Sequence, residues 1–276
     1  MSSYLAAGLD PCLFAQEVRL DPDPWQTTML RTQRKRIILN CARQTGKSTI
    51  TAASAEHRAI FFPGSLILII SPSLKQSMEV FKKICDIRLL ERYPLEMVED
   101  TKTSCVYTNG SRILCLPGSE SSIRGYSAPD MIIIDECARV DQAVLDALRP
   151  MLATTPDSKL VLLSTPNGKN NEFARVWFEH DTEWLKIGVV AKNCPRISAE
   201  FLAREKLTLA PWIYKREYEC SFDEPAGSLF RMDDINNAID TSVKPLFGGH
   251  DTDTPALVSI KTEKVFDTGI PVMGAT

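Results

Sequence analysis

The sequence contains no hydrophobic run long enough to cross a membrane. A spanning helix needs roughly 18 apolar residues in succession, whereas the longest apolar runs here are residues 66–70 and 131–134. The amino-terminal segment MSSYLAAGLDPCLF also lacks the basic region, apolar block and cleavage site of a secretory signal. These absences exclude a helical membrane protein and predict a chain that no signal of this kind exports.

Cysteine and histidine patterns typical of zinc sites are missing as well. The 8 cysteines are scattered singly, without a Cys-x-x-Cys pair, and only 3 histidines are present. The cysteines therefore predict reduced, mostly buried thiols of a cytoplasmic protein. Excess positive charge is also absent, because 32 Lys and Arg stand against 35 Asp and Glu. Any contact with nucleic acid must therefore depend on a local basic patch.

What the sequence does have is the alternation of an α/β protein. Short runs rich in Ile, Leu and Val predict strands at residues 36–41, 66–71, 131–135 and 160–164. Helical patterns at 47–62 and 73–90 separate the first three runs. The 276 residues, 44% of them hydrophobic, suffice for one large domain. This order predicts a mainly parallel central sheet flanked by helices.

Two further segments depart from that alternation. Residues 103–116 hold two alternating runs around Asn109-Gly110, which predicts a β-hairpin. After residue 165 the pattern predicts a helix at 171–180, a strand at 184–190, and helices at 198–209 and 212–219. We expect this part to form a small lid-like subdomain at about residues 170–225. From about residue 240, Gly, Pro, Thr and Asp accumulate, which predicts a tail.

The sharpest motif is the segment CARQTGKS at residues 41–48, which lies between a predicted strand and a predicted helix. This is the arrangement of a phosphate-binding P-loop. Backbone N–H groups and the helix N-terminus surround phosphates, Lys47 neutralises them, and the Ser48 hydroxyl binds Mg²⁺. Gly46 lets the backbone approach the phosphates. Cys41 departs from the common pattern, which has glycine there; the alternative is an ordinary loop that opens a helix.

A pair of carboxylates ends the strand predicted at 131–135. Asp135 in this position is typical of the second P-loop nucleotidase motif, in which the aspartate holds Mg²⁺. Glu136 can then orient or deprotonate an attacking water. The alternative is a buried strand whose polar end reaches solvent. Because both motifs follow parallel strands, we expect them to meet at the same edge of the sheet.

Three arginines are candidates for stabilising a transferring phosphoryl group. Arg43 lies inside the loop and could reach the terminal phosphate. Arg124 precedes Gly125 and could serve a neighbouring subunit, with a surface ion pair as the alternative. Arg139 follows the carboxylates and is a weaker candidate.

Two other segments flank the predicted site. Ser164 and Thr165 follow the strand at 160–164 and could sense hydrolysis and transmit movement, although Pro166 and Gly168 would also suit a plain turn. Upstream, the amide of Gln26 could read an adenine edge. Trp25 beside it suits the core.

In this order the motifs resemble the ATPase half of the large terminase subunit of tailed bacteriophages, the motor that drives DNA into a procapsid. The resemblance covers roughly residues 20–230. In that family the phosphate loop often lacks its first glycine, so Cys41 agrees with it. The Asn-Gly hairpin, Ile123-Arg124-Gly125 and the segment 164–168 are also similar to family motifs.

The resemblance implies a role for each matching position. It assigns nucleotide binding to Gln26, Arg43, Gln44, Thr45, Gly46, Lys47, Ser48 and Thr49. It assigns catalysis to Glu136, Arg43 and Arg124, the metal to Ser48 and Asp135, and coupling to Ser164 and Thr165. The implied cofactors are ATP and Mg²⁺.

The resemblance also implies an organisation and a setting. The expected fold is a P-loop NTPase with an ATPase domain at residues 1–230, followed by a linker or tail at 231–276. The expected partners are double-stranded DNA, the portal protein and the small terminase subunit, and no membrane. Copies are expected to form a ring when assembled, with a monomer as the alternative in isolation. The expected location is the cytoplasm of the infected bacterial host.

The nuclease domain of full large terminases has no counterpart in the sequence given. Only about 46 residues follow Phe230, too few for such a domain. Asp251 and Asp253 stand in a Gly, Thr and Pro context that predicts solvated loop residues. We therefore expect no DNA cleavage by this chain.

Two other functions compete with a packaging motor. One is a helicase-like ATPase that remodels nucleic acid, although the chain is short for a second motor domain. The other is a nucleotide-binding assembly module without turnover, against which Glu136 argues. The densest basic cluster, Arg31, Arg34, Lys35 and Arg36, could contact DNA phosphates or simply be a solvated strand edge.

Overall fold

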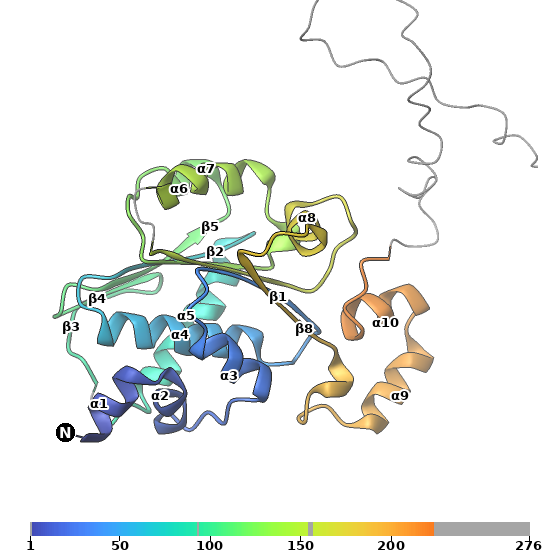
Figure 1. Cartoon of the computed structure of the whole chain (residues 1–276), viewed down its shortest axis with the longest axis horizontal. Helices are drawn as coiled ribbons and strands as arrows, with labels where there is room; N and C mark the ends of the chain where they lie inside the picture. Colours follow the sequence, from blue (N-terminus) through green and yellow to red (C-terminus); the bar gives the residue numbers. More distant parts are fainter. Residues whose placement is uncertain (1, 93, 154–156, 224–276) are drawn as a thin grey trace, which may run out of the picture. The chain divides into compact units, whose positions relative to one another are not determined.

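The predicted runs of Ile, Leu and Val become the central strands of one sheet. A computed structural model describes residues 2–92, 94–153 and 157–223 (Figure 1). Its strands are β1 (Arg36–Cys41), β2 (Leu66–Ser71), β3 (Met97–Asp100), β4 (Ser104–Tyr107), β5 (Arg112–Pro117), β6 (Met131–Asp135), β7 (Lys159–Ser164) and β8 (Trp184–Val189). Every residue of β2 and of β6 is buried, as continuous apolar strands covered on both faces should be.

The eight-stranded sheet has the order β3-β4-β5-β2-β6-β7-β1-β8. From β5 to β8 all neighbours are parallel, so the carboxyl ends of these strands share one edge. In particular, β7 lies between β6 and β1. The predicted α/β class with a mainly parallel sheet is confirmed.

The predicted hairpin is confirmed, and it is the antiparallel part of the sheet. β4 pairs with β5 across the Asn109-Gly110 turn, where Gly110 has φ +84°. Asn109 accepts a hydrogen bond from the Ser111 N–H at 2.9 Å and donates to the carbonyl of Ala59 at 2.8 Å. These bonds tie the turn to the end of a helix. The edge strand β3 pairs with β4 and has exposed residues throughout, which explains why its pattern gave no strand signal.

Helices cover both faces of the sheet (Figure 1). On one face lie α1 (Ser2–Leu9), α2 (Pro11–Glu17), α3 (Pro24–Arg31), α4 (Lys47–Phe61) and α5 (Leu74–Arg88). On the other lie α6 (Glu120–Ile123), α7 (Gln142–Ala153) and α8 (Glu172–Phe178). Ile37 and Leu39 point to the first cluster and Ile38 to the second, as alternation along a strand requires.

The lid-like subdomain expected at 170–225 is wrong at its beginning. β8 pairs with β1 along its whole length, and Phe173 and Val176 of α8 are buried in the core. Both elements therefore belong to the central fold. Only α9 (Ala199–Thr208) and α10 (Pro211–Tyr218), after the short 3-10 helix η2 (Ala191–Asn193), stand beside the sheet (Figure 1). The predicted tail at 231–276, with Asp251 and Asp253, lies outside the described residues.

Two expectations about the surroundings can be compared with the described residues. No helix among them has the length and apolar character that a bilayer crossing demands. All 8 cysteines are free thiols and all but Cys85 are buried. Burial raises the thiol pKa of Cys115 to about 12, so this cysteine is an inert core residue.

Candidate functional site

The loop at residues 41–48 joins β1 to α4 and has the backbone of a phosphate cradle. Gly46 is the N-cap of α4 with φ +88°, and Gln44 also has a positive φ of +61°. The Thr45 hydroxyl donates to the Ala42 carbonyl at 2.9 Å and closes the turn from inside. Loops of this shape direct successive N–H groups toward one point, at the positive end of a helix dipole. The loop can therefore bind an anion, as its sequence predicts.

The two predicted motifs meet at one edge of the sheet. Asp135 ends β6, and Glu136 follows it with φ +52°. The Ser48 hydroxyl lies 3.4 Å from a carboxylate oxygen of Asp135. The Lys47 Nζ lies 3.6 Å from Glu136 Oε1, and both groups are largely shielded from solvent. Residues 87 positions apart in the sequence thus form one site.

Burial and charge shape the protonation of the carboxylates. Burial and the negative charge of Glu136 raise the pKa of Asp135, while Lys47 and Lys83 act in the opposite direction. Lys83 comes from α5, and burial lowers its own pKa. Sequence reasoning missed Lys83, because it stands inside an ordinary amphipathic helix. A cation beside Asp135 would favour its charged form.

Arg139 connects the catalytic carboxylate to the coupling segment. Its Nη1 donates to Glu136 Oε2 at 2.7 Å and to the Thr165 hydroxyl at 3.4 Å. The Ser164 hydroxyl accepts from the Ala138 N–H at 3.3 Å and donates to the Thr165 carbonyl at 2.7 Å. The ends of β6 and β7 are thereby linked. Arg139, the weaker candidate from sequence, is the arginine that contacts Glu136.

Gln26 lies directly beside the phosphate loop. A Cβ on Gly46 would come within 2.9 Å of the Gln26 Nε2, so only glycine fits this approach. Gln26 Oε1 accepts from the Asp23 N–H at 2.9 Å, which fixes the amide at the start of α3. The position next to the loop is the one that a nucleotide-reading amide requires.

Arg196 is a residue that sequence reasoning missed. Its guanidinium contacts both carboxylate oxygens of Asp23, at 3.1 and 2.7 Å, and donates to the Thr45 carbonyl at 2.8 Å. It therefore ties the start of α3 to the phosphate loop. No local pattern identifies it, because its partners are 173 and 151 residues away in the sequence.

The other two predicted arginines have different partners. The Arg43 side chain forms an ion pair with Glu217 of α10, and the Arg43 N–H donates to the Glu217 carbonyl at 3.0 Å. Burial would raise the pKa of Glu217, but Arg43 and Arg216 lower it overall. Arg124 is 70% exposed and forms an ion pair with Glu120 on its own helix. Its exposure fits the predicted action on a neighbouring copy, which stays a prediction.

The basic cluster before β1 is engaged in local contacts. Arg31 pairs with Asp10 at 2.6 Å, and Lys35 pairs with Asp157 at 2.7 Å. Arg34 and Arg36 donate to backbone carbonyls of the chain. These contacts favour the solvated strand edge over a DNA-gripping patch. Thr49, predicted to bind nucleotide, is half-buried one residue after Ser48.

The oxygen donors at the sheet edge suit magnesium. A hydroxyl and a carboxylate, Ser48 and Asp135, are hard oxygen ligands, and Mg²⁺ takes its remaining ligands from phosphates and water. The described residues contain no group of three or more His, Cys, Asp or Glu that could hold a metal by itself. The donor set therefore fits an ion that arrives with a nucleotide.

Comparisons with curated proteins point to one family. Residues 38–237 match the family model described as terminase large subunit, T4likevirus-type, N-terminal. The large terminase subunit of Thermus virus P23-45 is 28% identical over 168 residues, which cover 54% of this chain and 34% of that protein. The probable large subunit of Enterobacteria phage P7 is 28% identical over 141 residues, 47% of this chain and 28% of that protein. The chain thus spans about a third of the length of these relatives.

Solved structures show the same fold. The ATPase domain of the Thermus phage P74-26 large terminase superposes with a TM-score of 0.69 at 19% identity, covering 78% of this chain and 100% of that domain. The large terminase of a thermophilic bacteriophage in complex with ADP gives 0.60 at 11% identity, covering 72% and 53%. The HK97 large terminase gives 0.60 at 15% identity, covering 72% and 50%. Since the family match covers most of its length, this chain belongs to the terminase large subunits of the T4-like virus type and corresponds to their N-terminal part.

Proposed function

We propose that this chain binds and hydrolyses Mg²⁺-ATP, and that hydrolysis in the assembled motor drives double-stranded DNA into a procapsid. The observation that supports this best is the meeting of two motifs, with Lys47 at 3.6 Å from Glu136 and Ser48 at 3.4 Å from Asp135. Either motif alone occurs in many sheets. Both at one edge supply the two halves of a nucleotide-hydrolysing site.

Each residue of the site has a separate task in this proposal. The N–H groups of the loop and Lys47 bind the phosphates, and Gln26 contacts the adenine. Ser48 and Asp135 hold Mg²⁺, which when bound would neutralise charge on the phosphate oxygens. Glu136 orients a water molecule for in-line attack and accepts its proton. The ion pair between Lys47 and Glu136 must loosen first, so that the lysine can turn to phosphate and the carboxylate to water.

Arginines supply the remaining positive charge. Arg43 acts on the terminal phosphate in cis once it leaves Glu217, and Arg124 acts from a neighbouring copy. An arginine that stabilises a transferring phosphoryl group contributes roughly 10³- to 10⁵-fold in turnover. Arg139 passes the change at Glu136 to Thr165, and so from β6 to β7.

The motor setting is part of the proposal, since the relatives named above are whole large subunits and this chain matches about a third of them. We propose that copies assemble as a ring on a portal protein, receive DNA from a small terminase subunit, and work in the infected bacterial host cell. DNA contacts through phosphates would make the DNA-stimulated activity fall with rising salt.

ATPase assays at several protein concentrations, with and without double-stranded DNA, test the proposal. Stimulation by duplex DNA that grows with protein concentration supports a ring motor, and stimulation by single strands alone favours the helicase alternative. Lys47→Ala should abolish phosphate release, whereas Lys75→Ala, an exposed lysine at the start of α5, should leave it unchanged. Nucleotide binding without turnover in the unaltered chain would favour the assembly module.

A further inference from the structure

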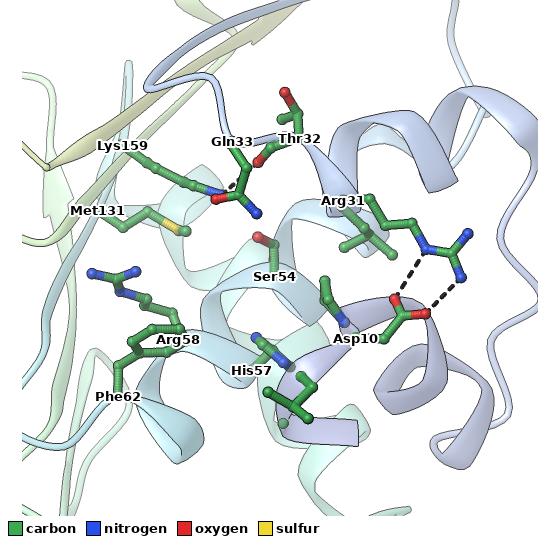
Figure 2. Close-up of a pocket in the computed structure, with 14 residues that line it drawn as sticks. Asp10, Arg31, Thr32, Gln33, Ser54, His57, Arg58, Phe62, Met131 and Lys159 are labelled. Carbon is green, nitrogen blue, oxygen red and sulfur yellow. Dashed lines mark hydrogen bonds and ion pairs between the residues drawn. The ribbon is translucent and has the colours of Figure 1, made fainter. Parts of the chain in front are cut away.

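A cavity lies at the end of the sheet opposite the phosphate loop. It has a volume of about 410 Å³, within the range of roughly 300–1,000 Å³ of small-molecule sites. Met131 and Lys159, the first residues of β6 and β7 and register partners, form its floor. The outer half of α4 forms one wall, and the α1–α2 junction and the end of α3 form the other (Figure 2). Arg58 is 11 residues beyond Lys47 on α4, or about 16 Å along the helix, so the two sites are separate.

The cavity gathers positive charge that the described chain neutralises only in part. Arg58 and Lys159 both extend to it (Figure 2). The pKa of Lys159 is lowered by burial and by the positive charge of Arg58, which shows that the two cations act on each other. The carboxylate in the lining, Asp10, is engaged by Arg31 through two bonds of 3.1 and 2.6 Å. It therefore does not compensate the pair.

Hydrogen-bond donors at the cavity are also incompletely used. The Nε of Arg58 is buried and has no acceptor among the described residues. Its Nη2 reaches Asp130 at 3.4 Å, a long contact with an aspartate that also accepts the Leu66 N–H. Lys159 donates to the Thr32 carbonyl at 3.0 Å, which leaves two of its three protons for other acceptors. A buried donor without an acceptor is costly unless something else supplies one.

We propose that this cavity binds the phosphate group of a small phosphomonoester. Two cations match a dianion better than a single carboxylate, and the hydroxyl of Ser54 stands between them to donate a further hydrogen bond (Figure 2). Leu30 and Met131 provide an apolar wall for the organic part of the ligand. The cavity thus has a charged end and an apolar side, as a site for a compound of mononucleotide size requires.

Calorimetric titration of the full chain carrying Lys47→Ala tests this proposal, because that background removes phosphate binding at the loop. The probes are inorganic phosphate, deoxyadenosine monophosphate and deoxyadenosine. We expect the monophosphate to bind more tightly than inorganic phosphate, and the nucleoside to bind at least roughly tenfold more weakly than its monophosphate, since charge-assisted bonds to phosphate are lost. The absence of phosphate binding, or equal binding of the nucleoside, would overturn the proposal. A monophosphate that binds no tighter than phosphate would refute the apolar wall.

Three variants locate the binding. Lys159→Met keeps the apolar stem and should weaken monophosphate binding by roughly tenfold or more. Ser54→Leu fills the cavity from α4 and should abolish binding without removing a charge. Lys35→Met removes a half-exposed lysine next to β1 outside the cavity and should change nothing. Equal losses in Lys159→Met and Lys35→Met, with unchanged melting curves, would place the ligand elsewhere.

Discussion

Glu136→Gln separates the two tasks that we assign to this carboxylate. The substitution keeps the shape of the side chain but removes its charge, so Lys47 loses its partner at 3.6 Å. At that distance and an effective dielectric constant of about 20, two unit charges attract by about 4.6 kcal/mol. Partial exposure, with 24% of the Glu136 side chain accessible, and the cost of desolvation reduce the net value to roughly 1 kcal/mol.

The variant should therefore bind ATP more tightly and hydrolyse it far more slowly. Lys47 no longer has to leave a carboxylate before it meets phosphate, and about 1 kcal/mol corresponds to about fivefold in the ATP dissociation constant. Loss of the general base should reduce kcat by roughly 10²- to 10⁴-fold.

Equilibrium binding of a fluorescent ATP analogue and phosphate release under saturating ATP measure the two effects. Glu200→Gln, in the exposed first turn of α9, is the matched control and should alter neither quantity. Weaker ATP binding by a folded Glu136→Gln protein would show that the ion pair with Lys47 does not compete with phosphate. An unchanged kcat would move the base to another residue.

Three other perturbations test neighbouring parts of the argument. Arg196→Ala should raise the KM for ATP by about tenfold with little change in kcat, because charge-assisted bonds to the loop are lost; Arg204→Ala on the exposed side of α9 is its control, and a pure kcat effect would contradict a positioning role. Mixtures of Arg124→Ala and Glu136→Gln proteins should recover hydrolysis that neither shows alone, and no recovery means that Arg124 does not act between copies. Burial lowers the pKa of His57 from 6.5 to about 4, so the unfolded chain takes up the proton first and stability is lost as the pH falls below about 6.5. By pH 5 this costs about 2 kcal/mol, and urea midpoints at pH 7 and 5 should differ less in His57→Gln than in the unaltered chain; an equal difference would refute the role of His57.

The central strands and the phosphate loop were predictable because their signals are local. Strands covered on both faces need continuous apolar residues, and a helix that begins at a phosphate loop needs Gly46, Lys47 and Ser48 in succession. The meeting of Lys47 with Glu136 was predictable as well, since parallel strands present their carboxyl ends at one edge. Here the pattern of the sequence determines the geometry.

Pairing over long distances was not predictable in the same way. The strand at 184–189 shows its own pattern, but nothing in it names β1 as its neighbour, so the sequence placed it in a separate lid. Arg196 and Glu217 are ordinary charged residues of the 190–220 region until the fold brings them to the loop. Arg139 was underrated for the same reason, because its contact with Thr165 depends on the adjacency of β6 and β7.

The ion pairs of the site show how nucleotide binding can be converted into movement. Lys47, Arg43 and Arg196 surround the loop, and each is held by a carboxylate of the chain, namely Glu136, Glu217 and Asp23. A triphosphate that recruits the first two cations must release their carboxylates, since one ammonium or guanidinium cannot satisfy both partners fully. Released Glu136 becomes available to water, and released Glu217 loosens α10 from the loop. Binding would thus prepare the base and free the lid in the same event, and Glu217→Gln should weaken the second effect without touching the first. Protection of α10 amides from hydrogen exchange, compared with and without a non-hydrolysable ATP analogue, measures that difference; protection that does not respond to the nucleotide in the unaltered chain would refute the link.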